Sequence, residues 1–396
     1  MQKTKYLIIG GGMTADAAVS GIRETDPEGR ITLVSAEPDP PYTRPLLTKG
    51  LWTGKPFEKV WRGTEAKGAE LHLSRRIVSL DPIARSGRDD HGEDYVFEVA
   101  LLATGGTVRR LPFGGDDVIY YRTLEDYRRL RALADHKQRF VVIGGGFIGT
   151  EIAAALASNG KRVTMVHPGV ALGERVYPRA LAEFITFYYG EKGVEVLTGA
   201  SALDVQPAGE GLTVQVRLAD GRERALPADG VVAGIGIQPD TTLARAAGLV
   251  CDNGVEVNEY LETSAAGVFA AGDVAAFRSQ ALGQRVRVEH EDNALTMGKL
   301  AGKNLAGGRE PYHHLPYFYS DLFDLGYEAV GDLDPALTTT ADWVDRFRKG
   351  VVYYTRDGRI RGVLLWNVWD KIPAARRLIE SAREFRPEEL KLALLD

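Results

Sequence analysis

Cysteine is almost absent from this chain: Cys251 is the only one among 396 residues. One thiol cannot form an intramolecular disulfide or a Cys-x-x-Cys redox pair, and alone it cannot ligate zinc or an iron–sulfur cluster. We therefore expect no metal site, and any electron relay must be a bound organic cofactor. Cys251 itself is interpreted as a buried or incidental thiol rather than a catalytic nucleophile.

Long apolar runs are also missing, and so is an excess of basic charge. No apolar run approaches the roughly 18 residues that a membrane span requires. Forty-nine Lys and Arg against 54 Asp and Glu give a net charge of −5, which does not favour bulk binding to nucleic acid. The first strand is expected to begin by Lys5, which leaves no room for a targeting peptide, so a cytoplasmic location is expected.

The N-terminal segment has the pattern of a phosphate-binding turn. An apolar strand over residues 5–9 is followed by a G-x-G-x-x-A turn with Gly10, Gly12 and Ala15, and then by an Ala-rich helical run. Gly10 permits the tight turn, Gly12 lets the backbone approach a pyrophosphate, and Ala15 keeps the helix close to the sheet. A second strand leads to Glu37, a carboxylate suited to the adenosine ribose hydroxyls. This order predicts dinucleotide binding.

The same pattern recurs 134 positions later. An apolar strand over residues 140–143 leads into a complete G-x-G-x-x-G turn with Gly144, Gly146 and Gly149, and then into a helix. Two Rossmann turns predict two dinucleotides; the alternative is a duplication in which the second site is dead. All three glycines are kept, which favours a working site.

The end of the second strand in this repeat carries no acid. The strand runs into His167, with no carboxylate within three positions on either side. An NADH-selective site usually has a carboxylate here to repel a 2′-phosphate. Its absence, with Arg162 and Arg175 nearby in the sequence, favours tolerance of NADPH. The alternative is that His167 merely caps the strand, and the expected donor is NADH or NADPH.

Three further segments follow in the order found in two-dinucleotide flavoproteins, which this sequence resembles. In that family the turn at Thr104 and Gly105 passes beside the flavin nucleotide, and the turn at Gly236 leaves the second domain. The segment ending in Gly272 and Asp273 then brings the backbone and a carboxylate to the ribityl chain. The resemblance therefore implies FAD as the first dinucleotide.

Longer stretches resemble one branch of that family, the apoptosis-inducing factors and the ferredoxin reductases of oxygenase systems. Residues 41–49 resemble its R-P-P-L-S-K stretch, and residues 288–294 resemble V-E-H-x-D-x-A. Further similar stretches are residues 318–322, 326–331, 362–367 and 372–376. The basic surplus and the long insertion of the animal mitochondrial protein are absent, so its death-signalling and nucleic-acid roles are not carried over.

The resemblance also implies a set of site residues. Lys49 and Glu151, on the first turn of the second Rossmann helix, would form an ion pair beside the flavin as the catalytic pair. The alternatives are that Lys49 is a solvated loop lysine and that Glu151 is only a partner of the helix dipole. Arg44 would contact the flavin or its pyrophosphate. Around the nicotinamide the resemblance places Glu289, His290 and Tyr319, with a core or capping role as the alternative for His290.

The expected fold class is α/β, with two Rossmann-like domains and a C-terminal α+β domain. We assign residues 1–115 and 250–309 to a discontinuous FAD domain, residues 116–249 to the NAD(P)H domain and residues 310–396 to the C-terminal domain. A hairpin at residues 357–358 and a helix over residues 373–385 are expected in this last domain. By resemblance, it can also carry the contact of a homodimer.

The expected function is an NAD(P)H oxidoreductase that passes electrons through FAD to a ferredoxin, a quinone or another small acceptor. A disulfide acceptor is excluded by the missing cysteine pair. Two basic clusters are candidate docking sites for an acidic ferredoxin, unless they are simply solvated faces. Their members are Lys371, Arg376, Arg377 and Arg383 on the C-terminal helix, and Arg278, Arg285 and Arg287. The alternative function is a slow, redox-gated protein whose reduced state controls the binding of a partner.

Overall fold

The computed structural model describes residues 1–391 and 393–395. Backbone contacts divide the chain into two units. Unit 1 contains Met1–Thr43, Phe57–Thr107 and Gln238–Phe318, and unit 2 contains Arg44–Pro56, Val108–Ile237 and Tyr319–Asp396. The sequence-based assignment to three domains stays a prediction.

Unit 1 is built on a seven-stranded sheet in the order β3-β2-β1-β6-β5-β4, with β19 also paired to β6. Its strands are β1 (Gln2–Ile9), β2 (Ile31–Val34), β3 (Ala69–His72), β4 (Ile77–Asp81), β5 (Ser86–Asp89), β6 (Asp94–Leu102) and β19 (Val268–Ala270). The pairs that join β3, β2, β1, β6 and β19 are parallel, whereas β4 and β5 pair antiparallel. All four residues of β2 are buried, as expected for a parallel strand covered on both faces.

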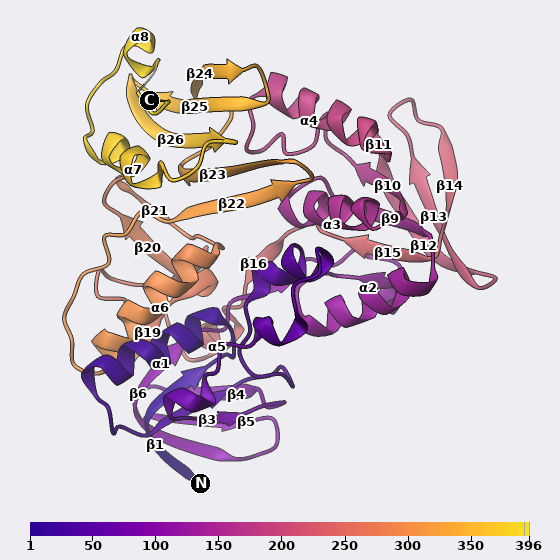
Figure 1. Cartoon of the computed structure of the whole chain (residues 1–396). Coiled ribbons are helices and arrows are strands. Elements are labelled where there is room, and N and C mark those ends of the chain that lie inside the picture. Colours follow the sequence, from indigo (N-terminus) through magenta and orange to yellow (C-terminus); the bar gives the residue numbers. More distant parts are fainter. Residues whose placement is uncertain (392, 396) are drawn as a thin grey trace. The chain divides into compact units, whose positions relative to one another are not determined.

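Two helices of unit 1, α1 (Met13–Thr25) and α6 (Glu291–Leu305), lie side by side (Figure 1). Glycines allow this close approach. A Cβ added at Gly21 would lie 2.0 Å from the Lys299 carbonyl oxygen, and one at Gly302 would lie 2.1 Å from the Ala18 carbonyl oxygen. Any larger side chain at these two positions would push the helices apart.

Unit 1 also contains several shorter elements. They are α5 (Thr242–Ala246), β17 (Cys251–Asp252), β18 (Gly254–Glu256), β20 (Ala275–Ser279) and β21 (Gln284–Val286). Two short strands, β7 (Gly106–Val108) and β16 (Ile237–Pro239), lie where the chain passes from one unit to the other.

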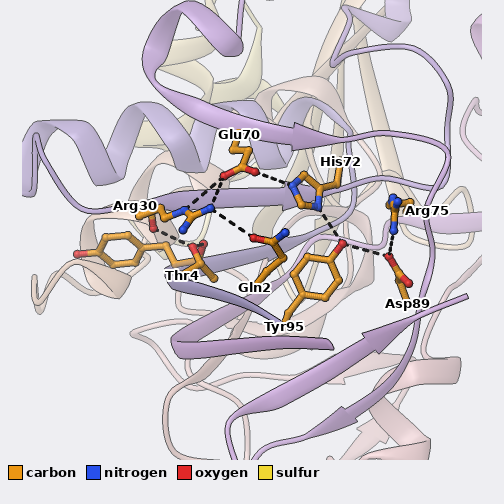
Figure 2. Close-up of polar contacts among 9 residues, drawn as sticks. Gln2, Thr4, Arg30, Glu70, His72, Arg75, Asp89 and Tyr95 are labelled. Atoms are coloured by element: carbon orange, nitrogen blue, oxygen red, sulfur yellow. Dashed lines mark hydrogen bonds and ion pairs between the residues drawn. The ribbon is translucent and has the colours of Figure 1, made fainter. Parts of the chain in front are cut away.

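A chain of polar contacts ties β3 to the antiparallel strands of unit 1 (Figure 2). Arg30 donates to Glu70 at 2.9 Å, and the other Glu70 oxygen lies 2.9 Å from His72 Nε2. His72 Nδ1 lies 2.8 Å from the Tyr95 hydroxyl, which donates to Asp89 at 3.1 Å. Tyr95 and Asp89 are buried. Because buried polar groups are costly unless they are hydrogen-bonded, the contacts among His72, Tyr95 and Asp89 help to fix how these strands pack.

Unit 2 contains a second parallel sheet, in the order β11-β10-β9-β15-β8. Its strands are β8 (Val118–Ile119), β9 (Arg139–Ile143), β10 (Arg162–His167), β11 (Val194–Thr198) and β15 (Gly230–Ala233). The helices are α2 (Leu124–His136), α3 (Phe147–Ser158) and α4 (Arg179–Glu191). An antiparallel sheet of β12 (Ser201–Ala208), β13 (Gly211–Arg217) and β14 (Glu223–Ala228) accompanies them.

The C-terminal part of the chain forms a five-stranded sheet in the order β22-β23-β26-β25-β24. The strands are β22 (Tyr317–Leu322), β23 (Leu325–Gly331), β24 (Thr338–Asp345), β25 (Lys349–Arg356) and β26 (Arg359–Trp366). The hairpin between β25 and β26 turns at Asp357 and Gly358, both with positive φ, which the turn signal predicted. The fold class expected from the sequence, α/β with two Rossmann-like domains and a C-terminal α+β domain, is confirmed, and the C-terminal part is rich in sheet.

The helix expected over residues 373–385 is shorter than predicted. α7 spans Ile372–Glu380, and Ala382 has a φ of 50°, so the helix cannot continue past it. Arg383 therefore lies outside this helix, and it pairs instead with Glu389 of the short helix α8 (Pro387–Leu390). α7 packs against β23 and β26 (Figure 1).

Candidate cofactor-binding site

The first phosphate-binding turn lies between β1 and α1, as the sequence predicted. Gly10 has a φ of +120°, and a Cβ there would lie 2.1 Å from the Ala103 carbonyl oxygen. Gly12 is the opposite case, because a Cβ at Gly12 would meet nothing within 4 Å. Gly12 is also the N-cap of α1, and no side chain caps the helix. The turn thus packs tightly on one side and leaves open helix N–H groups on the other, which fits a pyrophosphate.

Two other residues predicted for the first dinucleotide are Ala15 and Glu37. Ala15 is fully buried. Glu37 follows β2 and accepts a hydrogen bond from the Tyr42 hydroxyl at 2.6 Å, while its backbone N–H donates to Ser35 Oγ at 3.2 Å. These contacts fix a carboxylate beyond the carboxyl end of β2, where an adenosine ribose binds in such folds.

Asp16 was not singled out from the sequence, although it lies beside this turn. Its side chain is fully buried and accepts from Arg62 Nε at 2.6 Å, Lys67 Nζ at 2.6 Å and Thr64 Oγ1 at 2.7 Å. A charged residue among the apolar positions of the helical run was the available signal. Asp16 ties the segment around residues 62–67 to the first turn of α1.

The closing segments of unit 1 are held mainly through their backbone. The Thr104 hydroxyl donates to the Asp240 carbonyl at 2.8 Å, and the Gly105 carbonyl accepts from the Asp240 N–H at 3.0 Å. A Cβ at Gly272 would lie 2.2 Å from Thr14 Oγ1, so this glycine packs directly against α1. Asp273 follows it, at the end of the buried strand β19 and the short turn after it.

His290 and Glu289 also belong to unit 1. The His290 ring stacks on Phe318 with centroids 4.2 Å apart, and His290 is the N-cap residue of α6, although its side chain makes no capping hydrogen bond. Burial lowers the pKa of His290 to about 4, against the opposing charges of Asp273 and Asp292, so the ring is neutral at pH 7. Glu289 is more exposed and pairs with Arg287 at 2.6 Å.

The second phosphate-binding turn, in unit 2, repeats the geometry of the first. Gly144 has a φ of +111°, and a Cβ there would lie 2.4 Å from the Gly234 carbonyl oxygen. Gly146 is the uncapped N-cap of α3, and a Cβ there would meet nothing within 4 Å. A Cβ at Gly149 would lie 2.1 Å from the Gly144 carbonyl oxygen, so any larger residue at position 149 would clash with the turn. The second turn therefore has the form of a working site.

Unit 2 also brings Lys49 and Glu151 together. Lys49 Nζ lies 2.7 Å from Glu151 Oε1, and the side chains are 16% and 5% exposed. Two hydroxyls that sequence reasoning missed complete the cluster: Thr48 Oγ1 donates to Glu151 at 2.5 Å and Ser320 Oγ donates at 2.6 Å. The Lys49 ammonium also lies 5.1 Å from the centre of the Tyr319 ring. Both hydroxyl residues lie inside motif stretches, which was the available signal.

The position of Glu151 in its helix corrects one expectation. The sequence placed it on the first turn, but α3 begins at Phe147, so Glu151 is the fifth residue and lies in the second turn. It is therefore beyond the reach of the open N–H groups at the helix start. Its hydrogen-bond donors come from other segments, which makes the helix dipole a minor partner.

The remaining predicted residues of unit 2 are placed as follows. Arg44 donates to the Arg122 carbonyl at 2.9 Å. Gly236 has a φ of +93°, and its carbonyl accepts from the Arg109 N–H at 2.9 Å. His167 is the last residue of β10, and the Glu174 carboxylate lies 3.6 Å from its Nε2. Glu174 lies seven positions after His167, outside the three positions on either side in which the sequence shows no acid.

Other kinds of centre are not evident in the described residues. Burial raises the pKa of the Cys251 thiol, which makes the reactive thiolate scarce at pH 7. Among residues 1–391 and 393–395, no group of three or more His, Cys, Asp or Glu side chains could hold a metal ion. No helix in this part of the chain is long and apolar enough to cross a membrane. The features that the described residues offer for chemistry are one phosphate-binding turn in each unit and, in unit 2, the mostly buried Lys49–Glu151 pair.

Comparison with known proteins finds that two protein families match this chain. The family described as pyridine nucleotide-disulphide oxidoreductase matches residues 4–298. The C-terminal family of apoptosis-inducing factor, mitochondrion-associated, matches residues 301–346 and 341–381. Together the two matches extend over most of the chain.

Individual relatives match over nearly the full length. Monodehydroascorbate reductase 3 of Arabidopsis thaliana is 32% identical over 396 residues, covering 91% of this chain and 89% of that protein. The ferredoxin–NAD(+) reductase component of the anthranilate 1,2-dioxygenase system of Burkholderia cepacia is 33% identical, covering 98% and 97%. Putidaredoxin reductase, in its covalent complex with putidaredoxin, superposes with a TM-score of 0.90 at 28% identity, covering 98% of this chain and 95% of that one.

Proposed function

Because the chain belongs to the pyridine nucleotide-disulphide oxidoreductase family, we propose that it passes electrons from NADH or NADPH through FAD to a small iron–sulfur protein of the ferredoxin class. Its general activity is that of an NAD(P)H-dependent flavoprotein reductase that delivers electrons to an acceptor. The ferredoxin is the specific part of the proposal, and the similarity to ferredoxin reductases over nearly the full chain supports it.

One observation carries the proposal: the chain has two open phosphate-binding turns but one cysteine. Two turns provide for two dinucleotides, and FAD, when bound, takes a hydride from the nicotinamide and releases the electrons to an acceptor. A single thiol cannot serve as a dithiol relay between them. The electrons therefore leave for an external acceptor that is not a disulfide.

Residues of unit 1 would bind FAD, and residues of unit 2 would bind NAD(P)H. In unit 1, the open N–H groups at the start of α1 would hold the FAD pyrophosphate beside Gly12, Glu37 would bind the adenosine ribose and Asp273 the ribityl chain. In unit 2, the start of α3 at Gly146 would hold the pyrophosphate of NAD(P)H. The open space at both N-cap glycines supports this assignment.

Lys49 would supply the charge that the reaction needs. Its ammonium is mostly buried, and Glu151 holds it with the help of Thr48 and Ser320. A fixed positive charge in a dry site stabilises negative charge that develops on a reduced cofactor, without reorganisation at the moment of reaction. Glu151 would act as the positioning residue for this ammonium.

An acidic ferredoxin would need a basic face for docking. Arg285 and Arg287 are poor candidates, because Arg285 pairs with Glu256 and donates to the Ala276 carbonyl, and Arg287 pairs with Glu289. Arg377 on α7 is exposed and fits the role better.

The test is steady-state turnover of the FAD-loaded protein with NADH and, separately, a [2Fe–2S] ferredoxin, a quinone, ferricyanide and glutathione disulfide as acceptors. Ferredoxin reduction should be efficient and should weaken as salt rises. Arg377→Glu should raise the KM for ferredoxin and leave ferricyanide reduction unchanged, and Cys251→Ser should change neither. Efficient reduction of glutathione disulfide alone would contradict the proposal.

A second candidate function is redox-gated binding of a partner, favoured by the match of residues 301–346 and 341–381 to the C-terminal family of apoptosis-inducing factor. It predicts slow turnover with every acceptor, together with partner binding that changes when the protein is reduced. The turnover screen separates the two candidates. Homodimerisation through residues 310–396 and a cytoplasmic location stay predictions, and light scattering of the purified protein tests the first.

A further inference from the structure

The acid that is missing at the end of β10 is replaced by one from the following loop. Glu174 Oε1 lies 3.6 Å from Nε2 of His167, the residue at the strand end. The other carboxylate oxygen, Oε2, accepts from the Val170 N–H at 2.8 Å and from the Ala171 N–H at 3.3 Å. Two backbone donors therefore orient a negative charge where Rossmann folds read the adenosine ribose.

This loop is tied to the phosphate-binding turn itself. The Gly173 N–H donates to the carbonyl of Gly145, the central residue of the turn, at 2.9 Å. The Leu172 N–H donates to Thr186 Oγ1 of α4 at 2.8 Å. The position of Glu174 relative to the turn is thus fixed by hydrogen bonds on the residues immediately before it.

Small residues create the space for the pair of side chains. A Cβ added at Gly145 would lie 2.8 Å from the His167 ring, and one at Gly169 would lie 1.8 Å from Glu174 Oε1. Both contacts are too short for a real side chain. Glycine at these two positions leaves the space that the imidazole and the carboxylate occupy, and a larger residue at either position would displace them.

The nearby positive groups do not cancel this charge. Burial lowers the pKa of His167, while Glu174 raises it and Arg175 lowers it, so the ring is neutral at pH 7. Arg162 begins β10, five residues before His167, and at about 3.3 Å per residue it lies about 16 Å away, at the opposite end of the strand. Arg175 is exposed and next to Glu174 in the chain. It is the single basic residue near this end among those that the sequence suggested.

We propose that Glu174 selects NADH over NADPH, by accepting a hydrogen bond from the adenosine ribose 2′-hydroxyl and repelling a 2′-phosphate. This inference deepens the proposed function and rests on it, because it assumes that the second turn binds a nicotinamide nucleotide. It reverses the tolerance of NADPH expected from the sequence, which depended on the absence of a nearby acid.

The expected size of the effect is about tenfold. A 2′-phosphate carries about 1.5 to 2 negative charges at pH 7. At roughly 5 Å in a solvent-exposed setting, repulsion from one carboxylate costs about 1 to 2 kcal/mol, which is roughly a factor of ten in affinity. The exposed Arg175 reduces this preference but, with water around it, does not reverse it.

The experiment measures the dissociation constants of NAD⁺ and NADP⁺ by calorimetry on the FAD-loaded protein, so that no turnover is needed. Stopped-flow reduction by NADH and NADPH gives the corresponding rates. The variants are Glu174→Gln, which keeps an acceptor for the Val170 N–H, and Glu174→Asp, which keeps the charge. The matched control is Glu183→Gln, which removes an exposed carboxylate from α4 of the same unit.

The wild type should bind NAD⁺ about tenfold more tightly than NADP⁺. Glu174→Gln should bring the two constants within about threefold, mainly by strengthening NADP⁺ binding, while Glu174→Asp and Glu183→Gln keep the wild-type order. A wild type that prefers NADP⁺, or an affinity ratio that Glu174→Gln leaves unchanged, would overturn the assignment of Glu174 and leave the proposed function intact. Binding of neither nucleotide would overturn the proposed function and this inference together.

Discussion

Replacing Lys49 by Met is expected to slow reduction of FAD by NADH about a hundredfold while FAD stays bound. Lys49 is the last residue of the motif stretch 41–49, and its side chain is only 16% exposed. Removal of one preorganised electrostatic partner from a dry active site typically costs about 2.7 to 4 kcal/mol of the barrier. We take the lower end, because Lys49 retains some contact with solvent, and each 1.36 kcal/mol corresponds to a factor of ten.

The same substitution should also lower stability, because it leaves the Glu151 carboxylate buried without its counter-charge. Breaking a buried ion pair by removing one partner costs about 3 to 5 kcal/mol. Two hydroxyl donors, from Thr48 and Ser320, remain on Glu151, so about 3 kcal/mol is expected for Lys49→Met. Glu151→Gln should cost a similar amount. The double variant should be more stable than either single variant, because neither charge is then left alone.

The assays are stopped-flow absorbance of the flavin under anaerobic conditions and a double-mutant cycle in urea, followed by circular dichroism at saturating FAD. The matched control is the Arg179–Glu183 pair, which has a similar separation of 2.8 Å but is largely exposed and should show much smaller coupling. Additive single effects in the Lys49–Glu151 cycle would show that the pair is not an energetic unit. Wild-type reduction by Lys49→Met would remove Lys49 from the mechanism.

Three further outcomes are expected. Gly12→Val should fold but lose FAD, because its side chain would fill the space beside the open α1 N-terminus, whereas Gly190→Ala, equally free of neighbours within 4 Å, should keep FAD. The free energy of unfolding of the wild type should fall by up to about 3 kcal/mol as the pH drops from 6.5 to 4, because the unfolded chain protonates His290 and the folded chain does not. The stability that neutral His290 contributes is fully present above pH 6.5. In parallel urea titrations, His290→Asn should remove this pH dependence. Asp16→Asn should destabilise the protein by about 3 kcal/mol in the same assay, because Arg62 and Lys67 lose their buried partner.

Each of these outcomes has a clear contrary result. A yellow Gly12→Val protein that releases FAD on heating would show that the open side of the turn does not face the cofactor. An unchanged pH profile in His290→Asn would mean that the loss of stability at low pH comes from other groups. Wild-type stability in Asp16→Asn would mean that water replaces the buried carboxylate at no cost.

The phosphate-binding turns were the most predictable part of this protein. A tight strand-to-helix turn needs glycine at fixed spacing, and the strands that flank it are continuous apolar runs, so the signal is local. The second strand expected ahead of Glu37 is β2 (Ile31–Val34), and the turn at Asp357 and Gly358 joins the two strands of the expected hairpin. The helix ends predicted from the local sequence were wrong in two places: α3 begins before Gly149, and α7 ends before Ala382.

By itself, the sequence determined the fold class and the two dinucleotides, because both depend on residue types at short, fixed spacings. Its single cysteine also excluded a dithiol relay within the chain. Only the tertiary structure decided which side chains complete each site. Thr48 and Ser320 donate to Glu151 from 103 and 169 residues away, and Asp16 collects its partners from 46 to 51 residues away. Glu174 reaches the end of β10 because a loop folds back onto the phosphate-binding turn through backbone hydrogen bonds. Such contacts depend on where the chain returns in space, and no spacing rule along the sequence encodes that.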